Sequence, residues 1–168
     1  YGVRAVAVES VEAAVRGADV INVATAGAVS PEIQDEWLKE GVLLTLPASA
    51  ALSLNTMKSA RIVVDNWKMY EAYAQELRGL PGGYAANLSG ICGYLMDLVE
   101  GGEIPQQDIV NLGDVIAGKQ EGRRDDQERV IFIMDGMPIE DLAWGYTVYE
   151  NAKEMGLGTK LNLWEKTR

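Results

Sequence analysis

Three short segments carry small or polar residues directly after an apolar run. Thr25-Ala26-Gly27 lies at the end of the apolar run that begins at Ala18. Pro47-Ala48-Ser49 follows the run Gly41–Leu46, and Asp135-Gly136 follows the run Arg129–Met134. If the apolar runs are parallel strands, these segments meet at the carboxyl edge of one sheet, where the ligands of open α/β sheets bind. Small residues let a ligand approach the backbone closely. The spacing therefore predicts a site for a small molecule.

The residue types exclude several other kinds of chemistry. The chain has no histidine, so it cannot by itself form a Ser-His or Cys-His dyad or a histidine-bearing zinc site, and we predict no metal. Its net charge of −10 would repel a nucleic-acid backbone or an anionic membrane. No apolar run approaches the roughly 18 residues of a membrane span. The lone Cys92 cannot form an internal disulfide, which favours a reducing, cytoplasmic location.

The order of predicted elements indicates an α/β fold. Runs rich in β-branched residues predict strands at Val3–Val8, Ala18–Thr25, Gly41–Leu46, Arg61–Asp65 and Arg129–Met134. Caps and helical periodicity predict helices at Val11–Arg16, Ser30–Leu38, Trp67–Leu77, Tyr84–Val99, Asp108–Ile116 and Ile139–Met155. Strands that are apolar on both faces favour a parallel sheet covered by helices on both sides. An α+β domain with antiparallel pairs is the alternative.

A turn that could hold a dinucleotide pyrophosphate is missing from this sequence. Such a turn places closely spaced glycines between a strand and a helix. Gly156 and Gly158 instead follow a predicted helix, which is typical of a helix stop. The chain also begins with Tyr1 and without an initiating Met, so we expect a piece of a longer protein. We predict an incomplete doubly wound, Rossmann-like sheet, mostly parallel, with flanking helices and a long C-terminal helix.

Three segments together resemble the ornithine cyclodeaminase/μ-crystallin family. They are Val11–Ile21 with the following Ala24-Thr25, Asp108–Lys119, and the closing stretch Glu140–Thr159. The resemblance implies a homodimeric NAD(P)-dependent enzyme that acts on an amino acid or its imine. It also implies that residues 1–135 are part of an NAD(P)-binding domain. Residues 136–168 would form a closing helix and tail that pack toward a substrate and dimerisation domain outside this sequence.

The resemblance also implies roles for the three segments. Thr25-Ala26-Gly27 is similar to the loop that passes along the cofactor's ribose and nicotinamide, and Met134-Asp135-Gly136 takes the place of a segment that faces the nicotinamide. There Asp135 would hold a carboxamide or a substrate ammonium group. The catalytic aspartate of cyclodeaminases aligns with Ala50 or Ser49, so the usual cyclodeaminase acid is absent and Ser49 is expected near the substrate. Ordinary turns are the alternative for all three segments.

Three functional hypotheses follow from the resemblance. The first is part of an NAD(P)-dependent oxidoreductase or cyclodeaminase. The second is a non-enzymatic, μ-crystallin-like binding or dimer module, and the third is a subunit completed by a separate N-terminal piece. Because the phosphate-binding turn is missing, we do not expect this chain alone to bind NAD or NADP tightly. Asp65 and Asn66 are interpreted as the cap of the helix that follows, and Cys92 as a core residue.

Overall fold

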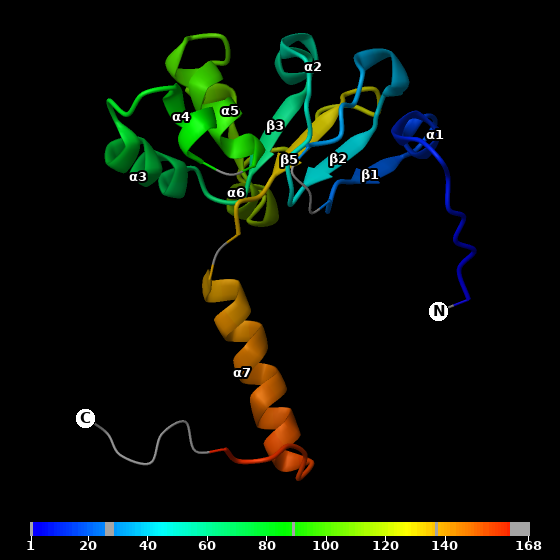
Figure 1. The fold of residues 1–168 in the computed structure, drawn as a ribbon, viewed down its shortest axis with the longest axis vertical. Coiled ribbons are helices and arrows are strands. Elements are labelled where there is room, and N and C mark those ends of the chain that lie inside the picture. Colours follow the sequence, from blue (N-terminus) through cyan, green and yellow to red (C-terminus); the bar gives the residue numbers. More distant parts are fainter. Residues whose placement is uncertain (1, 26–28, 89, 137, 162–168) are drawn as a thin grey trace. The chain divides into compact units, whose positions relative to one another are not determined.

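The structure is a computed structural model that describes residues 2–25, 29–88, 90–136 and 138–161. The chain divides into two compact units, residues 1–136 and residues 137–168. We call the first the sheet unit and the second the helical unit (Figure 1).

The sheet unit is built on five strands that run parallel throughout. They are β1 (Val20–Asn22), β2 (Leu43–Leu46), β3 (Arg61–Val64), β4 (Val110–Asn111) and β5 (Val130–Ile133). Their order across the sheet is β1-β2-β5-β3-β4, so the last strand in sequence lies in the centre and pairs with both β2 and β3 (Figure 1). The predicted parallel α/β fold is confirmed, and the antiparallel alternative is wrong.

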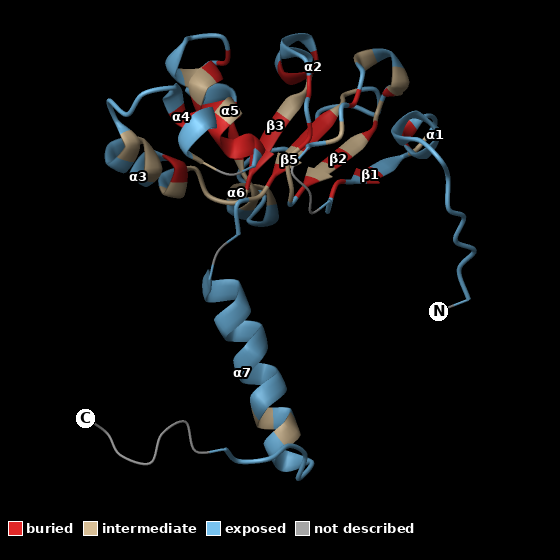
Figure 2. Cartoon of the chain, in the orientation of Figure 1, coloured by how far each residue is buried: buried red, intermediate tan, exposed pale blue. Residues whose placement is uncertain are grey.

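The strands carry apolar residues on both faces, and helices pack against each face. Leu44, Val64 and Ile131 are fully buried in the main core, which also holds residues of α2, α3, α4 and α5. The alternate residues Val63, Val110 and Val130 form a smaller cluster on which Leu112 and Val115 of α6 pack. Successive strand residues point to opposite faces of a sheet. The buried residues accordingly follow the strands and the helix faces that touch them (Figure 2).

The helices of the sheet unit are short, and side chains cap the starts of the first three. They are α1 (Val11–Val15), α2 (Leu54–Ser59), α3 (Trp67–Leu77), α4 (Gly83–Asn87), α5 (Ile91–Glu100) and α6 (Leu112–Ile116), with 3-10 turns η1 (Asp35–Trp37) and η2 (Gln106–Asp108). Ser10, Ser53 and Asn66 each accept a hydrogen bond from a backbone N–H of the first turn of α1, α2 and α3. The prediction for α3 matches its observed bounds.

Two predictions near the N-terminus are wrong. Residues Val3–Val8 form no strand, and their side chains are exposed. An alternating pattern makes a strand only where a neighbouring strand supplies hydrogen bonds, and the described residues supply none there. Ser30–Leu38 is not a helix either: Pro31 and Ile33 exchange backbone hydrogen bonds with Ala51 in an extended bridge, and only η1 is helical. In this extended segment the side chain of Ile33 is buried in the core.

Two helix predictions are only partly right. The predicted helix Tyr84–Val99 is divided into α4 and α5, between which Gly90 has a left-handed φ of 85°. The division lets α4 pack directly on α5 at Gly93, where an added Cβ would lie 2.6 Å from the carbonyl oxygen of Tyr84. The predicted helix Asp108–Ile116 begins at the last residue of η2 and contains the strand β4 and then α6. β4 pairs with β3, a contact that local periodicity does not reveal.

The helical unit consists of α7 (Pro138–Glu154) and the residues after it. Within the described part of α7 no residue is buried, and its large apolar side chains are exposed. They include Ile139, Leu142, Trp144, Tyr146, Val148 and Tyr149. Among the described residues, every helix is too short or too polar to cross a membrane.

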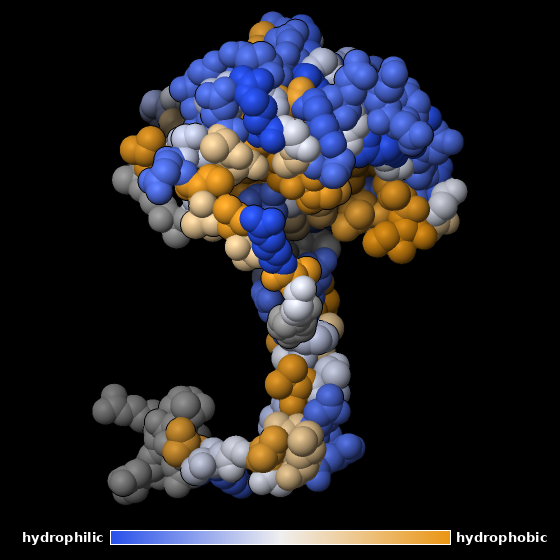
Figure 3. All heavy atoms as spheres, turned by 90° about the vertical axis from the view of Figure 1, so that its right-hand side faces the viewer, coloured by the Kyte–Doolittle hydropathy of each residue, from blue (hydrophilic) through white to orange (hydrophobic). Residues whose placement is uncertain are grey.

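The sheet unit also exposes apolar side chains on the side that carries α1 and β1. Figure 3 shows this face, which is largely hydrophilic except for hydrophobic side chains gathered along one border. The exposed valines of this part of the chain are Val3, Val6, Val8, Val11, Val20 and Val29. Because β1 pairs only with β2 among the described strands, one of its edges is open.

Candidate functional site

A cavity of about 360 Å³ opens where β1, β2 and β5 end. It lies at the carboxyl edge of the parallel sheet, the edge at which ligands of such sheets bind. Four of the predicted site residues line it: Thr25, Pro47, Ser49 and Asp135. Residues that are up to 110 positions apart in sequence thus converge on one cavity, because parallel strands bring their ends together.

The remaining predicted residues have different places. Ala26 and Gly27 lie outside the described residues. Gly136 follows Asp135 and has a left-handed φ of 87°, which a residue with a Cβ adopts only under strain. Ala50 is 7% exposed and packs in the hydrophobic core. Ser49 rather than Ala50 therefore faces the cavity.

Backbone hydrogen bonds beyond the strands hold the edge of the cavity in place. The N–H of Ala48 donates to the carbonyl of Val23 at 3.1 Å, and the N–H of Met134 donates to that of Leu46 at 3.4 Å. Thr45 Oγ1 donates to Asn22 Oδ1 at 2.8 Å and joins β2 to β1. The three strand ends consequently form one continuous rim.

Asp135 is the charged residue among those that line the described cavity. The thiol of Cys92 donates to its Oδ1 at 3.5 Å. Tyr73 of α3 also hydrogen-bonds to Asp135, and this bond, followed by burial, raises the pKa of Tyr73 to about 12. Cys92 belongs to the first turn of α5, so the carboxylate lies near the positive end of that helix. Two donors and a helix dipole thus accommodate the negative charge.

Cys92 itself is not a nucleophile in this setting. Burial, followed by the negative charge of Asp135, raises the pKa of its thiol to about 12. At neutral pH the thiol stays protonated, and only the thiolate attacks an electrophile or binds a metal. Cys92 is 2% exposed and fills the core beside the cavity.

The Asp65 carboxylate touches the same turn from the neighbouring strand. Its Oδ2 accepts hydrogen bonds from the backbone N–H groups of Asp135 and Gly136, at 2.9 Å and 3.1 Å. From the sequence, we predicted Asp65 only as part of a helix cap. A usable signal was available for Asp65, since it directly follows β3 and therefore lies at the carboxyl edge. The contact of Tyr73 depends on how α3 packs, which no local pattern gives.

Tyr70 of α3 lies close to this cluster and is fully buried. Burial, together with the negative charge of Asp65, raises the pKa of its phenol well above the ordinary value. Its ring stacks on that of Trp67, with 5.5 Å between ring centroids. Tyr70 therefore stays neutral, and its side chain anchors the N-terminal part of α3 in the main core.

The residue types in the described lining suit some parts of a dinucleotide better than others. A nicotinamide carboxamide is neutral and carries N–H donors, for which the Asp135 carboxylate is a suitable acceptor. A pyrophosphate needs backbone N–H groups or cations, and the described lining contains no Lys or Arg. In the described part of the chain, His, Cys, Asp and Glu form no group that could hold a metal ion.

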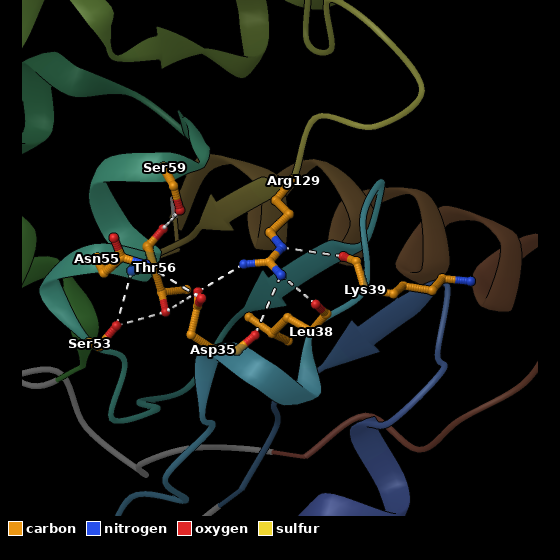
Figure 4. Close-up of polar contacts among 8 residues, drawn as sticks. All are labelled: Asp35, Leu38, Lys39, Ser53, Asn55, Thr56, Ser59 and Arg129. Carbon is orange, nitrogen blue, oxygen red and sulfur yellow. Dashed lines mark hydrogen bonds and ion pairs between the residues drawn. The ribbon is translucent and has the colours of Figure 1, made fainter.

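A second polar cluster lies at the opposite end of β5 and has a structural role. The guanidinium of Arg129 donates to the Asp35 carboxylate at 2.8 Å and also to the carbonyls of Asp35, Leu38 and Lys39 (Figure 4). The buried hydroxyl of Thr56 donates to the same carboxylate at 3.0 Å. This cluster joins η1, α2 and the start of β5, and its polar groups are occupied by one another.

The chain is similar in sequence to proteins that are named as dehydrogenases. The chain is 30% identical over 145 residues to an alanine dehydrogenase of Archaeoglobus fulgidus, covering 83% of this chain and 39% of that protein. It is 25% identical over 160 residues to the N-((2S)-2-amino-2-carboxyethyl)-L-glutamate dehydrogenase of Staphylococcus aureus, covering 95% and 42%.

Two solved structures share the arrangement of elements. The Δ(1)-pyrroline-2-carboxylate reductase of Thermococcus litoralis, in complex with NADH and L-proline, superposes with a TM-score of 0.66 at 25% identity, covering 92% of this chain and 44% of that one. An archaeal alanine dehydrogenase dimer with bound NAD gives 0.63 at 27% identity, covering 94% and 45%. The chain thus spans less than half the length of these relatives. The model of the ornithine cyclodeaminase/mu-crystallin family matches residues 1–156, and the chain belongs to that family.

Proposed function

We propose that the complete protein containing this chain is an NAD(P)-dependent oxidoreductase that acts at the α-carbon of an amino acid or its imine. The observation that carries the proposal is the cavity at the carboxyl edge, whose lining includes Thr25, Pro47, Ser49 and Asp135. The relatives support it, because they are named as dehydrogenases and reductases of such compounds.

The cavity residues would bind and orient rather than transfer protons. The cofactor supplies the hydride chemistry when bound. Asp135 would accept a hydrogen bond from the carboxamide or from a substrate ammonium group, and Thr25 and Pro47 would line the nicotinamide side. Ser49 would lie near the substrate. We also propose a homodimer and, from the lone buried thiol of Cys92, a reducing cytoplasmic location.

The residues around the cavity suit a reductase better than a cyclodeaminase. Ala50 can neither accept nor donate a proton, and it is buried in the core. Hydride transfer to a preformed imine needs less from that position, because water or the substrate amine can supply the proton. We therefore propose imine reduction, or the reverse oxidation of an amino acid, as the reaction.

The test is turnover by the full product of the gene. Purified protein is supplied with NADH or NADPH and with cyclic imines, or with α-keto acids plus ammonia, and the loss of reduced nicotinamide is followed by absorbance. We expect turnover with one of these pairs. We expect Asp135→Asn to weaken binding of the nicotinamide or of a cationic substrate, while Asp126→Asn, in an exposed loop, leaves both unchanged. Absence of turnover with every pair would contradict the proposal.

A binding module without catalysis is the second candidate. The observation that favours it is the buried, apolar Ala50, which with Ser49 is one of the two residues that could align with the cyclodeaminase aspartate. Tight cofactor binding to the full gene product without turnover would support this candidate. Turnover only after a separately expressed N-terminal piece is added would support the two-piece hypothesis. The 168-residue chain alone is expected to change NADH fluorescence very little, because the described residues that line its cavity include no Lys or Arg to hold a pyrophosphate.

A further inference from the structure

The turn after β5 is held by a carboxylate on the next strand. β3 and β5 are paired in register, with Val64 opposite Ile133, so the residues after them lie side by side. The N–H of Asp65 donates to the carbonyl of Ile133 at 3.3 Å, which extends the pairing by one residue. Asp65 Oδ2 then accepts the N–H groups of both Asp135 and Gly136. One oxygen atom therefore fixes two successive peptide groups.

The cap of α3 does not require this arrangement. Asn66 is the N-cap residue of α3, and its side chain accepts the N–H of Lys68 at 3.2 Å. Asp65 Oδ1 accepts the N–H of Asn66, at 2.9 Å. Its other oxygen points across to β5, and this half of the carboxylate serves the turn rather than the helix.

Fixing the turn fixes the side chain that faces the cavity. With its own N–H bound to Asp65, Asp135 presents its carboxylate to Cys92 and Tyr73 at the cavity wall. Gly136 allows this geometry because its left-handed φ of 87° is unstrained only for glycine. Asp65 is not among the residues that line the described cavity, so any effect it has on a ligand passes through Asp135.

We propose that Asp65 is a positioning residue that holds the Asp135 carboxylate in the orientation required at the cavity. This inference rests on the proposed function for its consequence, because only a bound nicotinamide or substrate gives the orientation a purpose. The clamp itself is a property of the chain and is tested without any ligand.

The first experiment measures the clamp in the 168-residue chain. In Asp65→Ala, backbone amides of Asp135 and Gly136 should shift upfield in the ¹H-¹⁵N spectrum and exchange about tenfold faster, since hydrogen bonds to a charged group are lost. In Asp65→Asn, the amide oxygen can occupy the place of Oδ2 and should restore most of both effects. A spectrum otherwise unchanged shows that the variants remain folded.

The control replaces a carboxylate that does the same work elsewhere. Asp125 Oδ1 also accepts two neighbouring N–H groups, those of Gln127 at 2.9 Å and Glu128 at 2.8 Å, but it precedes β5. Asp125→Ala should leave the amides of Asp135 and Gly136 unchanged. If Asp65→Ala leaves them unchanged too, or if Asp65→Asn fails to restore them, the clamp is refuted.

The second experiment measures the consequence in the full gene product. Asp65→Ala should lower turnover or weaken nicotinamide binding by about tenfold, in parallel with Asp135→Asn, and Asp65→Asn should recover most of the loss. Asp125→Ala should not lower it. An unaltered Asp65→Ala enzyme would refute the positioning role. If the wild-type protein shows no turnover and no cofactor binding, the proposed function fails while the amide shifts still decide the clamp.

Discussion

Replacing Gly93 with alanine should destabilise the sheet unit, although alanine is the better helix former. Gly93 is buried in α5 where α4 crosses it. An added Cβ would lie 2.6 Å from the Tyr84 carbonyl oxygen and 2.8 Å from both the Tyr84 carbonyl carbon and Ala85 Cα. All three atoms belong to the backbone, so no side-chain rotation relieves the overlap.

The expected size follows from two opposing terms. Overpacking a close-packed interior costs about 1–3 kcal/mol, and three backbone overlaps place Gly93→Ala toward the upper part of that range. Alanine regains about 1 kcal/mol relative to glycine inside a helix. The net loss of unfolding free energy should therefore be about 1–2 kcal/mol, with α4 displaced from α5.

Gly113 provides the matched control for this substitution. It lies in α6, in the same unit, and an added Cβ there would meet nothing within 4 Å. Gly113→Ala should thus be neutral or stabilising by up to about 1 kcal/mol. Urea unfolding followed by circular dichroism compares the two variants with the wild-type chain. A Gly93→Ala chain as stable as the Gly113→Ala chain would refute the close contact between α4 and α5.

Three further outcomes are expected. Arg129→Met should lower the unfolding free energy by about 2 kcal/mol, because the Asp35 carboxylate loses its charged partner. Lys39→Met, which breaks an exposed ion pair with Asp19, should change the free energy of urea unfolding little. Equal effects of the two substitutions would contradict the structural role of the Arg129 cluster. At neutral pH, Cys92 should react with a thiol reagent on the order of a hundredfold more slowly in the folded chain than in urea, because a pKa of about 12 keeps the thiol protonated. Equal rates in the two conditions would refute the burial of Cys92. Tyr73 should ionise with a pKa of about 12, against an ordinary 10.0, so its hydrogen bond stabilises the fold fully below pH 10.0 and is lost as the pH rises toward 12. In an ultraviolet titration, Tyr73→Phe should remove an ionisation step near pH 12. Loss of a step near pH 10.0 instead would contradict the hydrogen bond to Asp135.

The parts of the fold that could be predicted are those encoded locally. β3, β5 and α3 have apolar runs or helical periodicity bounded by caps and glycines, and the structure places them nearly where expected. The errors occur where tertiary pairing overrides the local pattern. Pro31 to Ile33 become extended because Ala51 supplies hydrogen bonds, and β4 exists only because β3 lies beside it. A strand of two residues has no sequence pattern of its own.

The candidate site shows the same division. A single rule, that ligands bind at the carboxyl edge of parallel strands, was enough to select Thr25, Pro47, Ser49 and Asp135. The rule could not supply the partners of Asp135, because Cys92 and Asp65 are 43 and 70 positions away in sequence and reach it through packing. Their role depends on which strands are neighbours, and the order β2-β5-β3 was not readable from the strands themselves.

The central place of β5 bears on how the protein is made. While a ribosome is still adding residues before Val130, β1 with β2 and β3 with β4 are two separate ribbons, because among the described strands no ladder joins one ribbon to the other. The middle of the sheet closes only when nearly four fifths of the 168 residues have been synthesised and β5 enters between the ribbons. Nascent chains stalled just before this strand should therefore be captured by chaperones or proteases, and those stalled beyond the turn at Gly136, once that turn has left the exit tunnel, should resist both.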